Sequence, residues 1–359
     1  MGNLRSGAIF TAIAIAALVV SAAVLFGYLS SAPSASTLRL GFFPNVTHAQ
    51  ALYGVSTGLY QRSLQQALGA EFAIQPQVFN AGPAAIQALL SNHVDLIFVG
   101  PSPTLNGLSV APGILRVIAG ASSGGAVFVA QPGLDLSTNA SYSGKRFATP
   151  QWGNTQDLAL KYYLLNRTGH RTLDQGGDVD VVNAANPQIF TLFKLGQIDG
   201  AWVPEPWATR LIREANAKVV LDERSLWPRG QFVTTQLVTT ARYLNDHRDI
   251  LTAFLRAYVN VTLELQNATV SDLAIINDAI YNATNSRLDA GTIGAAFLNF
   301  NVTYDPIAPS LATYLKWAQD LDFLPRDLRT DALYDLSLLN GVLDQLGLPR
   351  VIGPWKARH

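Results

Sequence analysis

Five short polar segments recur along the chain where an apolar run changes to helical periodicity. They are rich in Asn, Thr, Ser, Gly and Pro, contain neither Lys nor Arg, and cover 44–48, 80–83, 100–103, 150–157 and 183–187. The N-terminus of a helix presents unpaired N–H groups and about half a positive charge, so it can bind an anion without a cationic side chain. If these segments converge, they form a neutral anion-binding site.

The composition excludes several other chemistries. The chain has 359 residues and no Cys, which removes disulfides, thiol catalysis and thiolate metal sites. Its five His lie at 48, 93, 170, 247 and 359, and no pair has HxxxH or HExxH spacing. Lys+Arg 25 against Asp+Glu 25 gives no net charge, which argues against a nucleic-acid partner. We therefore expect neither a metal nor a cofactor.

The elements that must position the polar segments form an internal repeat. Phe72–Pro103 and Val179–Trp207 each contain a β-rich run, Asn-Ala, a Pro that starts a helix, an Asp 12 residues after that Pro, and a second apolar run before another Pro. This is a βαβ pattern, and ligands bind such sheets beyond the carboxyl ends of the strands. Asp95 and Asp199 are expected to cap turns.

Two further strands are predicted, each leading into a polar segment and a helix. They are 38–43, before Pro44, and 145–149, before a helix at 158–165 with Asn154 or Thr155 as its N-cap. The runs 125–130 and 232–240 are interpreted as crossover strands that act as a hinge. The C-terminal part is helical, with apolar stripes typical of core.

Taken together, GFFPNVTHAQAL, FNAGPAAIQALL, DLIFVGPSP, ATPQWGNTQDLAL and IDGAWVPEPW resemble the substrate-binding components of ABC importers, in the aliphatic sulfonate, taurine and nitrate branch. LDERSLWPRGQFVTTQLV and LYDLSLLNGVL resemble the same group, and the likeness covers about residues 38–348. It implies an α/β, two-lobed periplasmic-binding-protein fold of type II with two hinge crossovers, preceded by a hydrophobic helix. It also implies capture of a small sulfonate or related oxyanion, and delivery to an ABC permease with its ATPase.

On this basis the chain divides into six parts. They are a signal or membrane anchor at 1–29, a Ser-rich linker at 30–37, the first part of lobe I at 38–128, lobe II at 129–231, the second part of lobe I at 232–348, and a tail at 349–359. The uncharged stretch 8–29 is long enough to span a bilayer, and places the rest extracytoplasmically. It is either retained or cleaved, after Ser34 or Ser36 or behind a short pilin-like leader.

Ligand contacts are predicted from residues in or beside the polar segments. The predicted set is Asn45, Thr47, His48, Ala81, Gly82, Gly100, Ser102, Gln151, Trp152, Asn154, Thr155, Gln156, Trp202 and Glu205. Several members have a structural alternative. His48 is either a donor to the ligand or a helix-start His bonded to the backbone. Trp152 and Trp202 either wall the pocket or pack between lobes. Glu205 either receives an amino group, as taurine would offer, or pairs with a cation such as Arg210.

Other functions remain open at this level. An enzyme is disfavoured because the chain lacks Cys and a clustered acid–base pair. A binding protein for a neutral or aromatic solute, such as a pyrimidine or flavin precursor, is the main alternative, and a surface-assembly protein that reuses the fold is another. Seven Asn-x-Ser/Thr sequons are either chance or a glycosylated surface, at Asn45, Asn139, Asn166, Asn260, Asn267, Asn282 and Asn301. Asn45 is the poorest candidate because it lies in a polar segment.

Overall fold

The structure is a computed structural model, and it describes residues 37–353. The expected anchor at 1–29 and most of the linker lie outside the described residues, as does most of the tail. Within 37–353, no helix is both long enough and apolar enough to cross a membrane. The first residues of the tail pack on the body: Val351 is buried and exchanges two hydrogen bonds with the side chain of Asn340.

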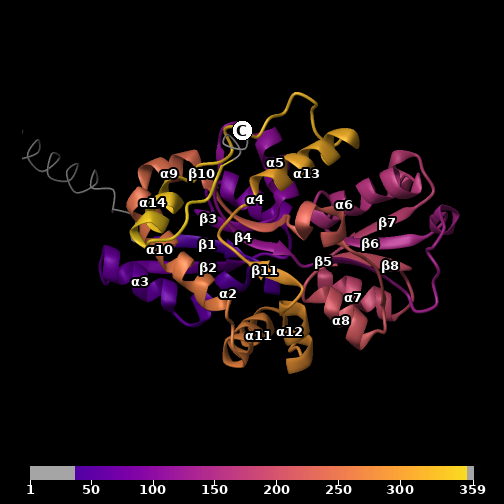
Figure 1. Ribbon diagram of the computed structural model, residues 1–359, viewed down its shortest axis with the longest axis horizontal. Coiled ribbons are helices and arrows are strands. Elements are labelled where there is room, and N and C mark those ends of the chain that lie inside the picture. The colour runs from indigo at the N-terminus through magenta and orange to yellow at the C-terminus, as the bar shows by residue number, and fades with distance from the viewer. Residues whose placement is uncertain (1–36, 354–359) are drawn as a thin grey trace, which may run out of the picture. The chain divides into compact units, whose positions relative to one another are not determined.

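The first lobe contains a six-stranded mixed sheet with strand order β11-β4-β10-β3-β1-β2 (Figure 1). Its strands are β1 (Thr37–Phe42), β2 (Ala73–Val78), β3 (Leu96–Val99), β4 (Leu115–Gly124), β10 (Val233–Thr240) and β11 (Phe300–Val302). β1 and β3 are parallel, whereas β10 runs antiparallel to both β3 and β4. All four residues of β3 are buried, which explains the uninterrupted apolar run in its sequence.

The second lobe contains a five-stranded mixed sheet with strand order β7-β6-β8-β5-β9. Its strands are β5 (Ala126–Ala130), β6 (Arg146–Pro150), β7 (Asp180–Ala184), β8 (Gly200–Pro204) and β9 (Lys218–Asp222). β6 is parallel to β7 and β8, and β5 is antiparallel to β8 and β9. The two sheets therefore share one plan, since β2-β1-β3-β10-β4 corresponds to β7-β6-β8-β5-β9.

The two Asp residues of the repeat do the same structural work in the two lobes. A carboxylate oxygen of Asp95 accepts the backbone N–H of Arg39 at 2.8 Å, and one of Asp199 accepts that of Arg146 at 2.7 Å. Each Asp thus ties the start of β3 or β8 to its parallel neighbour. Asp95 also forms an ion pair with the Arg39 guanidinium. Both Asp residues are structural, although they pin strands together and do not cap a turn.

The chain passes between the lobes twice, and the first crossing differs from the predicted boundary. β5 lies wholly in the second sheet, so a division between 128 and 129 would cut a strand. The crossing falls at Gly124 and Gly125, whose φ angles of 83° and 76° are in the left-handed region that glycine tolerates best. The return runs from β9 through two short 3-10 turns to β10. The run 232–240, predicted as a hinge strand, is a central strand of the first sheet.

Helices cover both sheets. Those of the first lobe are α2 (Ala49–Ser56), α3 (Leu59–Leu68), α4 (Gly82–Leu90), α5 (Pro101–Val110), α9 (Ala241–Asp246), α10 (Arg248–Leu265), α11 (Val270–Thr284), α12 (Ala290–Phe297), α13 (Ala308–Asp320) and α14 (Ser337–Gln345). Those of the second lobe are α6 (Thr155–Tyr163), α7 (Asn186–Lys194) and α8 (Trp207–Glu214). The C-terminal part is helical, as predicted, and the apolar stripe of α10 that includes Phe254 is buried. A 3-10 turn, η1 (Val46–His48), leads into α2.

Candidate ligand-binding site

A cavity lies between the two lobes, where strands end and helices begin. It contains about 350 Å³ of space that atoms do not fill, part of it open to solvent. Its lining is Phe43, Asn45, Thr47, His48, Asn80, Gly100, Asn154, Thr155, Gln156, Asn186, Pro204, Thr234 and Thr235. Among these described residues there is no Lys, Arg, Asp or Glu. The electrostatics of the cavity therefore come from amides, hydroxyls, one imidazole and helix ends.

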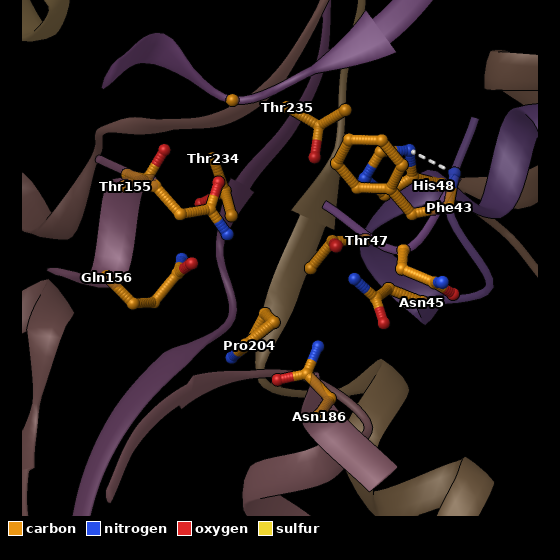
Figure 2. Close-up of a pocket in the computed structure, with 13 residues that line it drawn as sticks. Phe43, Asn45, Thr47, His48, Thr155, Gln156, Asn186, Pro204, Thr234 and Thr235 are labelled. Carbon is orange, nitrogen blue, oxygen red and sulfur yellow. Dashed lines mark hydrogen bonds between the residues drawn. The ribbon is translucent and has the colours of Figure 1, made fainter. Parts of the chain in front are cut away.

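Polar side chains face one another across this cavity (Figure 2). Asn45, Thr47 and His48 come from the segment between β1 and α2, and Thr155 and Gln156 begin α6 on the other side. In the structure as described for 37–353, no N-cap side chain of α2, α4, α5, α6 or α7 accepts a hydrogen bond from its own helix. A helix end without a side-chain cap keeps its N–H groups available for another partner.

His48 is buried and neutral. Its Nδ1 lies 3.4 Å from the backbone nitrogen of Phe43, which donates to it, so the proton of the ring is on Nε2. Burial lowers the pKa of His48 from 6.5 to about 3, because an imidazolium would lose its hydration there. The backbone bond and a place in the cavity lining therefore coexist: at neutral pH this His offers one N–H and no charge.

Two oxygens at the cavity have no hydrogen-bond partner within the part of the chain that the structure describes. They are Oγ1 of Thr155, at the first position of α6, and Oδ1 of Asn186, at the first position of α7. Both side chains are more than nine-tenths buried. Buried polar atoms are rarely left unpaired, since each costs about 1–3 kcal/mol. Their position at two helix N-termini suggests that a bound molecule completes them.

The lobes touch each other around the cavity. The indole Nε1 of Trp207 in α8 donates to Oδ1 of Asn45 at 3.0 Å, which orients the Asn45 amide and leaves its NH₂ group as a donor. Ser102 Oγ and Asn106 Nδ2 of α5 each donate to the Gly153 carbonyl at 3.1 Å. These bonds join the two sides of the cleft, so the structure is a closed arrangement of the lobes.

The structure places only some of the predicted residues at the cavity. Half of them line the cavity: Asn45, Thr47, His48, Gly100, Asn154, Thr155 and Gln156. Ala81, Gly82 and Ser102 lie buried beside it at the starts of α4 and α5, and Gln151 is exposed. The other three, Trp152, Trp202 and Glu205, lie elsewhere.

The two Trp residues do not wall the cavity. Trp202 is fully buried inside the second lobe, stacked on Phe128 at 5.5 Å, with its Nε1 donating to Glu223 at 2.8 Å. Its inward position follows from β8, a central strand with both faces covered. Trp152 is 58% exposed, and its ring lies 6.1 Å from that of Phe323.

Glu205 follows the cavity residue Pro204 but is directed away from the cavity. It is fully buried, and it accepts hydrogen bonds from the backbone N–H of Thr209 at 3.0 Å, the Thr209 hydroxyl at 2.9 Å and Nδ2 of Asn299 at 2.6 Å. The expected pairing with Arg210 is wrong, because Arg210 forms its ion pair with Glu214, one helical turn further on. Burial raises the pKa of Glu205 to about 7.

Sequence reasoning missed six lining residues. Asn80 and Asn186 lie in two of the predicted polar segments but were not singled out. Pro204 is the Pro that follows the second apolar run of the repeat, and Phe43 immediately precedes the first polar segment. Thr234 and Thr235 lie on β10 and were interpreted only as hinge. The signal that could have identified them is the run of three polar side chains, Thr234 to Gln236, in a strand that is buried along most of its length.

The chain matches the NMT1-like family over residues 31–275, which is more than half of its length, and it belongs to that family. Among curated proteins it is 26% identical over 183 residues to the taurine-binding periplasmic protein of Escherichia coli (strain K12). That alignment covers 51% of this chain and 54% of the relative, so the chain spans about half the length of the curated relative it matches.

Solved structures agree on the two-lobed fold. The alkanesulfonate-binding protein SsuA from Xanthomonas axonopodis pv. citri, bound to MOPS, superposes with a TM-score of 0.67 at 16% identity, covering 84% of this chain and 98% of that one. The periplasmic nitrate-binding protein NrtA from Synechocystis PCC 6803 superposes with a TM-score of 0.73 at 14% identity, covering 89% and 91%. At these identities the likeness establishes an α/β periplasmic-binding-protein-like architecture with mixed sheets.

Proposed function

We propose that this protein is an extracytoplasmic solute-binding protein of an ABC importer, and that it captures a small oxyanion such as a sulfonate or nitrate. The observation that carries the proposal is the cavity between the lobes, lined only by neutral groups and approached by helix N-termini from both sides. Its membrane partner would be a permease with its ATPase. The taurine-, alkanesulfonate- and nitrate-binding proteins that the chain resembles support this class of ligand.

Neutral donors are sufficient for such a ligand. Each helix end contributes about 0.3–1 kcal/mol to an anion, rising to about 2 kcal/mol when partly buried. Hydrogen bonds to a charged group contribute about 1.5–3 kcal/mol each. Two or three helix ends with donors from Asn45, His48 and Gln156 therefore approach the roughly 8 kcal/mol of micromolar binding.

An aromatic solute fits the cavity less well. Both Trp residues expected to stack on it lie outside the lining, and its rings are those of Phe43 and His48 alone among the described residues. A ligand amino group also finds no carboxylate at the wall, because Glu205 is turned toward Thr209 and Asn299. Catalysis finds little support in the same inventory, because within the described residues no hydrogen bond joins the His48 imidazole to any of the threonine hydroxyls in the lining.

Calorimetric titration of a ligand panel tests the proposal. The panel is ethanesulfonate, taurine, nitrate, hydrogencarbonate and a pyrimidine, and we expect at least one oxyanion to bind. Thr155→Val removes the unpartnered hydroxyl at nearly constant volume and should weaken that binding about tenfold. Thr191→Val, the same change at an exposed position of α7, should not. Binding of the pyrimidine with no response to any anion would refute the proposal.

We also propose that the protein is glycosylated on its surface. The six sequon Asn residues other than Asn45 are exposed, whereas Asn45 is buried in the cavity wall. Glycan on Asn45 would displace the Trp207 bond and fill the cavity. Mass spectrometry of the protein from its natural source should find hexose-bearing peptides from the six exposed sites and an unmodified Asn45. Unmodified peptides throughout would show that the sequons are chance.

A further inference from the structure

Gly100 lies where the two lobes pack closely against each other. It is the N-cap of α5 in the first lobe, with φ −74° and ψ 165°, an extended conformation open to any residue. Backbone freedom therefore does not explain a glycine here. The space does: a methyl group on Gly100 would lie 2.4 Å from Oγ1 of Thr155, which begins α6 in the second lobe. That distance is far inside van der Waals contact.

The obstruction to a side chain at Gly100 comes mainly from the opposite lobe. Within its own lobe the nearest atom to such a methyl group would be the Thr234 carbonyl oxygen, at 3.4 Å, which is a tolerable contact. The Thr155 Cβ would be at 3.5 Å, also ordinary. A single atom, Thr155 Oγ1, therefore excludes Ala at position 100 when the lobes are closed, and nothing excludes it when they are apart.

We propose that Gly100 is a positioning residue that sets how closely the lobes approach, with Thr155 Oγ1 as its counterpart. A glycine here lets the start of α6 lie against the start of α5, where Ser102 and Asn106 reach the Gly153 carbonyl. The same approach brings the Thr155 hydroxyl into the cavity wall. The Gly100–Thr155 contact thus fixes both the closed geometry and the width of the cavity. The statement about lobe closure does not depend on the proposed function, whereas the statement about the width of the ligand cavity rests on it.

Distances between spin labels test the inference directly. Because the chain has no Cys, labels attach only at introduced residues: Leu298→Cys in the first lobe and Leu195→Cys in the second, at positions 81% and 65% exposed. Without added ligand, we expect the ratio of the short-distance to the long-distance population to fall about tenfold in Gly100→Ala, because overpacking opposes closure. Gly341→Ala, the same change in a helix with nothing within 4 Å, should leave the ratio unchanged.

Two substitutions at Thr155 distinguish a steric effect of the Oγ1 position from an effect of the hydroxyl group itself. Thr155→Ala removes Oγ1, and in that background Gly100→Ala should change the ratio of the short-distance to the long-distance population by less than twofold. Thr155→Val also removes the hydroxyl but keeps an atom in its place, so the tenfold effect should persist. If Gly100→Ala leaves the label distances unchanged, or if its effect is the same in both backgrounds, the inference is wrong. Titration with ethanesulfonate, taurine and nitrate then reports separately on the proposed function, because the label measurement needs no ligand.

Discussion

The buried carboxyl of Glu205 should make the protein less stable as the pH rises. Burial raises its folded-state pKa from 4.5 to about 7, and its hydrogen bonds to Thr209 and Asn299 only partly oppose that effect. Between these two values the folded protein keeps a proton that the unfolded chain has released. The stabilisation is therefore complete below pH 4.5 and is lost progressively as the pH approaches 7 and passes it.

The magnitude follows from the two pKa values. Each pKa unit corresponds to about 1.36 kcal/mol, so deprotonation of Glu205 should lower the free energy of unfolding by about 2–3 kcal/mol from pH 5 to pH 8. Glu205→Gln is neutral throughout and should remove this dependence. Glu223 is also fully buried with its pKa raised to about 7, but it is present in both proteins and cancels in the comparison.

Urea unfolding followed by tryptophan fluorescence provides the assay. The difference in unfolding free energy between Glu205→Gln and the wild type should shift by about 2–3 kcal/mol in favour of the variant from pH 5 to pH 8. Glu71→Gln, at an exposed position, should follow the wild type. If the Glu205→Gln and wild-type curves run parallel, the carboxyl does not titrate in this range and the reasoning from burial is wrong.

Three further predictions concern buried polar groups. Because burial lowers the pKa of His48 to about 3, the free energy of unfolding of the wild type should fall by about 2 kcal/mol from pH 7.5 to pH 5. Denaturation of His48→Gln at the two pH values should not show this fall. An equal fall in the variant would contradict a buried, neutral His48. Asp157→Ala should lower the free energy of unfolding by about 3–5 kcal/mol, because it removes the buried carboxylate 3.2 Å from the Lys161 ammonium and leaves only the half-exposed Asp174 at 3.6 Å. Adding Lys161→Met should restore part of this loss, and a cost below about 1 kcal/mol would argue against the Asp157–Lys161 pair. Trp207→Phe removes the bond to Asn45, and should weaken calorimetrically measured oxyanion binding about 5- to 100-fold; unchanged affinity would exclude a role for that bond in the bound state.

The local sequence was sufficient to predict most strands and helices around the site. Apolar runs such as 96–99 are buried strands, and the Pro residues at 101 and 187 stand in the first turns of helices. These features follow from periodicity and from the backbone limits of proline, which act over a few residues. The repeat therefore indicated two similar βαβ units and a polar edge on each before any tertiary contact was known.

The lobe boundary and the direction of individual side chains were not predictable in this way. Gly124 and Gly125 make the crossing, but the sequence does not distinguish them from other glycine pairs in loops. Trp202 and Glu205 lie near the cavity in sequence yet are buried away from it: β8 is covered on both faces, and Glu205, just beyond it, bonds to Thr209 and Asn299. Only tertiary packing decides which of these side chains reach the cavity.

The sequence by itself determined the chemistry available to the site: neutral amides, hydroxyls and helix ends, with no cation in the junction segments. Tertiary structure alone decided which of these groups meet. Asn45 and Trp207 are 162 positions apart and share a buried hydrogen bond, and Gly100 adjoins Thr155 across the cleft. Contacts between lobes depend on how two rigid sheets are joined and rotated, and short-range patterns carry no information about that rotation.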